Sequence, residues 1–534
     1  MENAQFSFHW VDYAIVVIYF AAIIAHGVYV SRRVKSGADG YFLAGRALPW
    51  YLIGFSLYAS NMSGSSFVGL MGGAYENGIA IFNYEWTAAL VLVFFAIFIL
   101  PSYLRAKVST VPEYLEHRYG VRSRRAFSAF TLIAIMFIDT AGALYAGGLV
   151  ISNAIEPLSL WQASAALALV AGLYTILGGL SAVVVTDTVQ AIVLMAGSAL
   201  IFGFGLAEVG GWTALMESLS PEKRQLILPA DNDFLPWTGL WGVILLGFYY
   251  WTLNQFVVQR TLGARDLREG RRGSVFAGFL KLPNLFLMVS PGLIAFALYP
   301  DLSTPDLAFP KLAFELMPVG VQGLILAALI AAIMSSLDSA LNSAGTLFTL
   351  DFVKPLRPNL SEKALVAIGK VVTGVAMVVG AIYAPLIAGF ESLFSYFQSS
   401  LSYVVPAIVV VYLAGLFWRG GNDRGAFWTI FAGIIVGIPM FLSKEVFDWW
   451  TAAGLPDIHY TVMSSFIMIA AILLHVGLSL TAPRPGDQTV DQVVWNRDDF
   501  AADFAQVRRP ILGDYKVLAG VLLVLCAVPI ALFW

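Results

Sequence analysis

The sequence predicts an all-α membrane protein. Hydrophobic residues make up 59% and charged residues 12% of its 534 positions, which is more apolar surface than a soluble domain of this length can bury. The apolar residues gather in runs that suit membrane-spanning helices, since about 20 residues cross the hydrocarbon core of a bilayer. Most Lys and Arg lie between these runs or near their ends, whereas Lys281 stands inside one.

About fourteen such runs follow one another along the chain. Their approximate ranges are 10–30, 48–75, 79–104, 125–155, 161–179, 182–206, 235–262, 272–300, 321–350, 363–385, 388–417, 424–442, 459–481 and 516–534. The first run is too long for the core of a signal peptide and lacks a basic leader, so we expect a retained helix. The longest polar segments, near 207–234 and 482–515, are too short for catalytic domains. We therefore expect residues 1–534 to form a single membrane domain.

Charge distribution predicts the orientation and narrows the function. If the loops alternate between the two sides, one side holds only Lys223, Arg224, Lys311 and Lys444. The positive-inside rule then places the basic side in the cytoplasm and both termini outside it. The net charge of −3 argues against a nucleic-acid partner. Cys526 is the only cysteine and the five histidines are scattered, so neither a disulfide framework nor a zinc site is expected.

Two runs contain residues that a plain spanning helix does not need. The second has a small, polar patch at 58–66, where a helix could open, and the seventh places Asn254 and Gln255 after a glycine-rich stretch and an aromatic cluster. Interrupted helices five runs apart are typical of transporters built from inverted repeats. The repeats would span about 48–206 and 235–417, flanked by helices at 10–30, 424–442, 459–481 and 516–534. The alternative is that Gly and Ser only allow close helix packing.

Several motifs occur in an order that is informative. They are Phe42-Leu43-Ala44-Gly45-Arg46, Val111-Pro112-Glu113-Tyr114, Gly178 to Val183, Thr186 to Gln190, Gln259 to Leu262, and Ser335 to Ser343. In these motifs the chain resembles the sodium/solute symporter family, in its sugar-transporting branch. The resemblance implies a LeuT-type core of five plus five helices and sodium-coupled import of a sugar or sugar derivative by alternating access. A symporter for an organic acid or amino acid is the alternative, and a membrane enzyme or sensor on the same scaffold is a remote one.

The resemblance also implies a sodium (Na⁺) site between the second and ninth runs. Its ligands would be the backbone carbonyls of Ala59, Met62 and Ala332 and the hydroxyls of Ser335 and Ser336. The alternative is that these hydroxyls bond back to carbonyls of their own helix, as lone membrane serines usually do.

A second sodium site is left open. It would join Asp187 to Asp338 and Ser339, which share a helical face with Ser335. Asp338 stands where family members that couple two ions usually have a hydroxyl residue. The second carboxylate would strengthen cation binding or pair with a basic residue, so one ion and two ions remain alternatives.

The polar residues inside the runs predict the solute site. Lys281 lies roughly 15 Å beyond the preceding cytoplasmic Arg pair at helical rise, and a cation at that depth needs a partner or water. Asp139, in the middle of the fourth run, is one possible partner. The resemblance places Glu85, Lys281 and Gln398 on sugar hydroxyls and Tyr250 as a stacking inner gate.

Three positions depart from the bacterial sodium/galactose symporter of that branch. Its Gln, Ser and Asn are here Ser66, Ala88 and Gly247. All three residues are smaller, so we expect a roomier pocket and a solute other than D-galactose. Candidates are a short oligosaccharide, an amino sugar, or an acidic sugar whose carboxylate meets Lys281.

Overall fold

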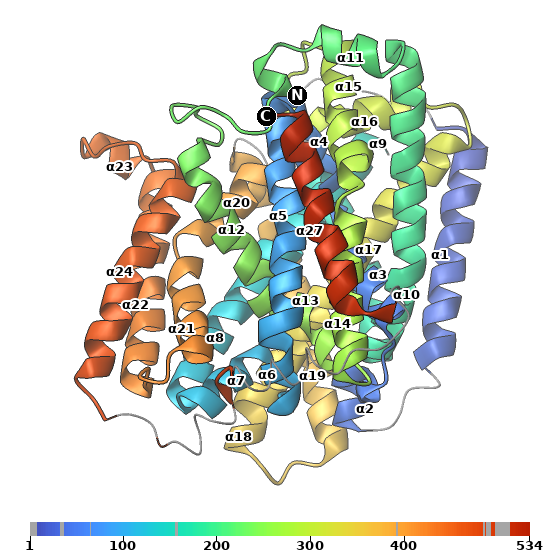
Figure 1. Ribbon diagram of the computed structural model, residues 1–534. Coiled ribbons are helices and arrows are strands. Elements are labelled where there is room, and N and C mark those ends of the chain that lie inside the picture. Colours follow the sequence, from blue (N-terminus) through green and yellow to red (C-terminus); the bar gives the residue numbers. More distant parts are fainter. Residues whose placement is uncertain are drawn as a thin grey trace.

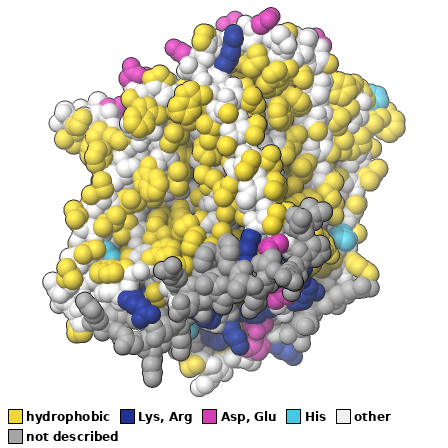
Figure 2. Space-filling model, viewed as in Figure 1, with side chains coloured by type: hydrophobic (Ala, Val, Ile, Leu, Met, Phe, Trp, Pro, Cys, Tyr) yellow, Lys and Arg dark blue, Asp and Glu magenta, His cyan; other side chains and the backbone are white. Residues whose placement is uncertain are grey.

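The computed structural model describes residues 8–31, 37–64, 66–154, 158–390, 393–483, 486, 493–496 and 513–534. Within these ranges the chain has helices and no named strand, and most helices run between the two ends of one body (Figure 1). A broad belt of hydrophobic side chains separates two charged ends (Figure 2). Nine described helices are long and apolar enough to cross a membrane, or up to eleven if each of two bent pairs is one span. The predicted all-α membrane class is confirmed.

The α-helices occupy all fourteen predicted ranges, but the number of spans stays a prediction because several ranges hold broken or joined helices. The bounds are α1 (Trp10–Ser31), α2 (Ala38–Leu43), α3 (Trp50–Asn61), α4 (Met71–Asn77), α5 (Asn83–Phe94), α6 (Leu100–Arg105), α7 (Val111–Arg118), α8 (Val121–Ala134), α9 (Ala141–Ala154), α10 (Leu160–Val209), α11 (Trp212–Ser218), α12 (Leu240–Phe248), α13 (Gln255–Leu262), α14 (Leu267–Lys281), α15 (Ser290–Leu298), α16 (Ala308–Lys311), α17 (Val321–Leu347), α18 (Lys354–Leu356), α19 (Glu362–Tyr383), α20 (Leu393–Ser402), α21 (Val405–Phe417), α22 (Asp423–Phe441), α23 (Trp449–Ala452), α24 (Tyr460–Leu480) and α27 (Tyr515–Leu532).

The two predicted interruptions are confirmed. Helix α3 ends at Asn61, and Met62 leaves the helical region with φ −80° and ψ 73°. Met62 and Ser63 are outside the helix, and the π-helical turn η2 (Ser66–Leu70) then leads into α4. Helix α12 runs through the π-helical turn η8 (Tyr249–Leu253) and breaks at Asn254, whose side chain accepts a hydrogen bond from the amide of Phe256 at the start of α13. Each break leaves helix-end carbonyls inside the membrane domain that need partners.

Helix α17 is the centre of the packing. It is buried along nearly its whole length and packs against α1, α3, α10, α13 and α19. Because α3 and α13 are the helices beside the two breaks, α17 is placed to supply partners for both of them. The second extensive contact is between α3 and α14, which brings Lys281 at the end of α14 close to the first break.

The flanking helices cover this core on several sides. Helix α1 lies against α10 and α17, α27 crosses α14 and α5, and α21, α22 and α24 form a group at the opposite side from α1 (Figure 1). The start of α1 and the end of α27 lie at the same end of the molecule (Figure 1). On the face in Figure 2, that end shows mainly Asp and Glu, and most Lys and Arg lie at the other.

Helix α10 joins the fifth and sixth predicted ranges through a kink at Gly179. This residue has φ +59° and ψ −170°, a conformation that costs an L-residue with a side chain but not glycine. A Cβ added there would also approach the carbonyl oxygen of Tyr41 to 2.6 Å. The glycine therefore fixes the direction of the second half of α10, which carries Asp187.

We expect Gly179→Ala to lower the thermal unfolding midpoint of the purified protein in detergent. The backbone at φ +59° and ψ −170° lies in a region essentially restricted to glycine and costs another residue about 1–3 kcal/mol, and the contact with Tyr41 adds to that cost. Gly203→Ala in the same helix is the matched control, because a Cβ there meets no atom within 4 Å. It should leave the midpoint unchanged or raise it, since Ala is the better helix former. Equal midpoints for the two variants would contradict the role of Gly179.

Candidate ion and solute sites

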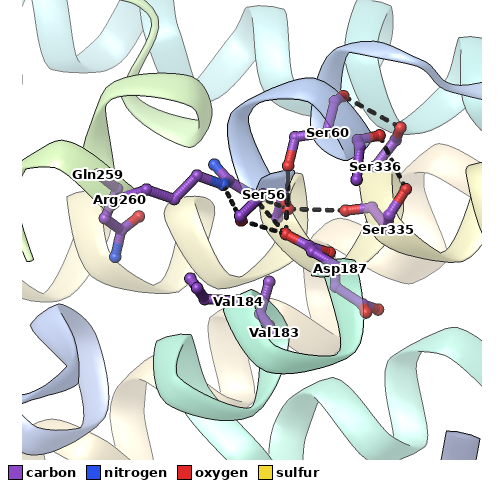
Figure 3. A network of polar contacts seen from close by, with 12 residues as sticks. Ser56, Ser60, Val183, Val184, Asp187, Gln259, Arg260, Ser335 and Ser336 are labelled. Carbon is purple, nitrogen blue, oxygen red and sulfur yellow. Dashed lines mark hydrogen bonds and ion pairs between the residues drawn. The ribbon is translucent and has the colours of Figure 1, made fainter. Parts of the chain in front are cut away.

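Two serines of α17 face the broken end of α3. The Oγ of Ser335 lies 2.9 Å from the carbonyl oxygens of both Ala59 and Ala332. The Oγ of Ser336 lies 3.2 Å from the carbonyl oxygen of Ser60 and 3.1 Å from that of Ala332 (Figure 3). Hydroxyls and carbonyls are neutral oxygen ligands, and opened helix ends of this kind bind sodium in transporters. The cluster can therefore hold a sodium ion without any acidic residue.

Four of the five predicted sodium ligands lie together in this cluster. Ala59, Ala332, Ser335 and Ser336 are brought together, and Ser60 joins them although the sequence did not single it out. The amide of Met62 donates to the carbonyl of Tyr58 at 2.9 Å. Both serines also reach the carbonyl of Ala332 in their own helix, as the back-bonding alternative expects. Their contacts with α3 carbonyls go beyond that alternative.

Asp187 lies in a buried network beside this cluster. Its Oδ2 accepts from the hydroxyls of Ser56 at 2.5 Å and Ser60 at 3.4 Å, and lies 3.4 Å from a guanidinium nitrogen of Arg260. Arg260 also donates to Ser56 at 2.6 Å and to the hydroxyl of Ser339 (Figure 3). A guanidinium thus supplies positive charge where the second sodium ion was predicted.

Ser339 and Asp338, the other residues of the predicted second sodium site, contact different partners. Ser339 lies 3.1 Å from the hydroxyl of Ser60 and belongs to the Asp187 network. Asp338 accepts a hydrogen bond of 2.8 Å from Thr175 of α10. Ser60 links the serine and carbonyl cluster to the Asp187 network, because its carbonyl contacts Ser336 and its hydroxyl contacts Asp187.

Arg260 is a buried cation beside Asp187 that the sequence did not indicate. It is 1% exposed, so Lys281 is not the only cation buried among the helices. The sequence feature that could have pointed to Arg260 was its position at the end of the apolar run 235–262, within the Gln259 to Leu262 motif. The sequence alone gave no way to match it with Asp187, which lies on a different helix.

Lys281 is paired with Glu85, and not with Asp139. Its Nζ lies 2.5 Å from the Glu85 carboxylate and also contacts the side-chain oxygen of Asn61. The amide of Asn284 donates to the same carboxylate at 2.5 Å, and Tyr58 donates to Asn284 at 2.9 Å. The pair is electrically neutral and each partner has a further hydrogen bond, from Lys281 to Asn61 and from Asn284 to Glu85, which explains how two charges are accommodated at this depth.

A cavity of about 140 Å³ lies between the two groups of residues. Five predicted solute residues line it, namely Glu85, Asp139, Gly247, Tyr250 and Gln398. Ser60, Asn61 and Ser336 line it as well, so the cavity touches the serine and carbonyl cluster directly. Much of the remaining wall is aromatic, formed by Tyr84, Trp251, Phe256, Phe394 and Phe397.

The three residues that differ from the sodium/galactose symporter, Ser66, Ala88 and Gly247, do not all line the cavity. Gly247 lines the cavity, and a Cβ there would meet only Val91, at 3.9 Å. Ala88 is packed in the core with 1% exposure. The side chain of Ser66 lies outside the described residues. A roomier pocket therefore stays a prediction, with Gly247 as its main support.

The comparisons with known proteins decide the family. A model of the sodium:solute symporter family matches residues 41–433. The chain belongs to the sodium:solute symporter family. Among its relatives, sodium/glucose cotransporter 4 of Danio rerio is 34% identical over 92% of this chain and 82% of its own. Sodium/myo-inositol cotransporter 2 of Oryctolagus cuniculus is 33% identical over 93% and 80%, and a sodium/glucose cotransporter of Vibrio parahaemolyticus is 32% identical over the full length of both chains.

Solved structures place the symporter in its fold class. A Na⁺-coupled sialic acid symporter in an outward-open state has a TM-score of 0.77 at 23% identity, covering 90% of this chain and 99% of the other. The nucleobase-cation symporter Mhp1 has a TM-score of 0.55 at 13% identity, covering 86% and 97%. The predicted LeuT-type fold is confirmed. The symporter is a multi-pass membrane transporter that couples sodium to the movement of a solute.

We expect the double substitution Ser335→Ala and Ser336→Ala to abolish sodium-driven uptake while the folded yield is retained, because it removes two oxygen ligands and adds no charge. The measurement is uptake into proteoliposomes under a sodium gradient, with sodium-induced thermal stabilisation as a second readout. Ser198→Ala is the control, since that buried hydroxyl bonds only to its own helix and to Met288 in the described structure. Wild-type sodium dependence in the double variant would remove this cluster from the mechanism.

Proposed function

We propose that this symporter imports a sugar or a sugar derivative together with sodium by alternating access. The observation that carries the proposal is the single cavity lined both by Ser60 and Ser336 of the ion cluster and by Glu85 and Gln398. One space in contact with both sets of ligands is what a coupled transporter of a small solute requires. Relatives named for glucose and myo-inositol transport both handle polyols, which supports the solute class.

The cavity wall has the chemistry that a polyol needs. Glu85 offers a carboxylate that accepts hydroxyl donors, and its position is fixed by Lys281 and Asn284. The amide of Gln398 both donates and accepts. Tyr250 and Trp251 present rings that can cover the apolar face of a sugar ring. Convergent polar groups on rigid helices, with aromatic walls between them, favour a hydroxylated ring over a flexible apolar solute.

Coupling would follow from the shared use of α3 and α17. Sodium would hold the opened end of α3 against Ser335 and Ser336, and the solute would contact Asn61 and Ser60 at that same end. A ligand stabilises the conformation that it binds best, so each ligand favours the arrangement that the other needs. The moving units would be the two repeats, at about 48–206 and 235–417.

The first ion site would be formed by Ala59, Met62, Ala332, Ser335 and Ser336. A second sodium ion at Asp187, Asp338 and Ser339 would require the guanidinium of Arg260 to leave Asp187, because two cations cannot share one carboxylate oxygen and its hydroxyl partners at low cost. The stoichiometry would then depend on whether Arg260 moves during the transport cycle.

We also propose that both termini lie outside the cytoplasm. The loops at the end of the molecule that carries the termini contain Lys223, Arg224 and Lys311, whereas the other end has the clusters at 105–125 and 265–272. Positive charge is retained on the cytoplasmic side during insertion.

Uptake into proteoliposomes tests the function. We expect a sodium gradient, but not a potassium gradient, to drive accumulation of a sugar or cyclitol. An inside-negative potential should accelerate uptake, since each net charge that crosses contributes about 2.3 kcal/mol per 100 mV. The double variant Glu85→Gln with Lys281→Met removes both charges of the pair together, and should weaken solute binding more than sodium binding. Full transport by this variant would show that the pair is only structural.

Labelling of single cysteines in intact cells tests the orientation. In a Cys526→Ala background, we expect a membrane-impermeant maleimide to label Glu222→Cys, beside α11, without permeabilisation. Arg357→Cys, beside α18 at the opposite end, should react only after permeabilisation. Both native side chains are exposed, so reactivity reports the side of the membrane. The reverse pattern would place the termini in the cytoplasm.

A further inference from the structure

Asp139 is an acidic residue in the cavity wall, and no basic residue among those the structure describes is paired with it. It lies in the π-helical turn η5 (Ile135–Thr140) between α8 and α9 and lines the cavity with Glu85. Its carboxylate interacts with the side chain of Asn254 at the second helix break. Across the described part of the chain it forms no salt bridge. Its titratable neighbours are the phenols of Tyr249, Tyr250 and Tyr396, which are uncharged at neutral pH.

The buried cations of this region are already engaged. Lys281 is held by Glu85 and Asn61, and Arg260 is held by Asp187, Ser56 and Ser339. The Glu85 and Lys281 charges cancel, so the charge on the cavity wall is that of Asp139. A carboxylate at this depth is costly unless it is paired. A cation that enters the cavity would supply the missing positive charge, and protonation of the carboxylate is the alternative.

The wall around Asp139 suits an ammonium group. Tyr250, Trp251, Phe394 and Phe397 line the same cavity, and aromatic faces attract cations. Trp251 already does so for Lys281, whose Nζ lies 5.5 Å from the ring centroid. An acid in a cavity with aromatic walls offers a cation both a counter-charge and a weakly hydrated environment. By contrast, an acidic sugar would find the Lys281 ammonium occupied by Glu85.

We propose that the solute carries a protonated amine that pairs with Asp139, so that the symporter takes an amino sugar or an aminocyclitol. The inference rests on the proposed function and narrows its solute class. Glu85 and Gln398 bind the hydroxyls, and Asp139 selects for the amine. Sodium or a proton at Asp139 are the competing occupants that the experiment has to separate.

Matched pairs of solutes test the proposal in proteoliposomes under a fixed sodium gradient. The pairs are D-glucosamine against D-glucose and an amino-inositol against myo-inositol, at a pH below the pKa of the amines. N-acetyl-D-glucosamine controls for the nitrogen substituent without its charge. We expect the wild type to prefer each amine by roughly 10-fold or more in apparent affinity, the range for a bond to a charged group. Asp139→Asn should remove that preference while transport of the neutral partner continues.

Asp306→Asn is the matched control. Asp306 is a second largely buried acid without a salt bridge among the described residues, but it lies in the turn η10 (Pro305–Leu307) and does not line the cavity. It should keep the preference for amines. A retained preference in Asp139→Asn would overturn the proposal, as would equal affinities within each pair in the wild type.

Two further outcomes identify the competing occupants. Weaker sodium binding by Asp139→Asn in the absence of solute would assign the carboxylate to an ion site. Loss of a pH dependence of neutral-sugar uptake in that variant would assign it to a proton. Either result overturns the amine proposal and leaves sodium-coupled sugar import standing. If no member of either pair were transported or bound with sodium, the proposed solute class itself would fail.

Discussion

The break at the end of α3 is the constraint on which the rest of the structure depends. An opened helix inside a membrane leaves carbonyl oxygens that lipid cannot satisfy, and each one costs several kcal/mol if it stays unpaired. Ser335 and Ser336 of α17 lie against two of these carbonyls. Because α17 is the most deeply packed helix, the break is held at the centre of the protein. A sodium ion bound here would be coordinated by the same oxygen atoms and would therefore stabilise this position of the end of α3.

Residues that follow from this break organise both polar networks. Asn61, the last residue of α3, contacts Lys281, and Ser60 contacts the Asp187 network. The Glu85–Lys281 pair and the Asp187–Arg260 pair thus contact adjacent residues, Asn61 and Ser60, at the end of α3. A displacement of that end changes the geometry of the ion cluster, the Glu85 pair and the Asp187 pair together. Coupling between ion and solute at the proposed sites would need no long pathway, because Ser60 and Ser336 line the same cavity as Glu85 and Gln398.

The sequence was sufficient for the class and the two interruptions, because each leaves a local signal, whereas the serine and carbonyl ligands were implied only by the family resemblance. Membrane helices are recognised by their apolar composition, and the polar patch at 58–66 and Asn254 are recognised because they interrupt apolar runs. The partner of Lys281 was not predictable in this way. Glu85 and Asp139 are both acids in apolar runs, and only the packing of α3 on α14 selects Glu85. The number of spans stays a prediction for a related reason, since two predicted ranges meet at the kink at Gly179 within one continuous helical element.

Arg260 shows why electrostatic pairing has to be judged in three dimensions. Its run ends close to a loop, so its position suggested a helix-end cation that reaches water, yet it is buried against Asp187. The cost of burying a charge is offset only when the partner and its hydrogen bonds are in place. Ser56 serves both partners, because it donates to Asp187 and accepts from Arg260. The cation, the acid and the shared hydroxyl stabilise one another on three different helices, and a movement that separates α3 from α10 breaks the contact between Ser56 and Asp187 and forces Arg260 to leave at least one of them.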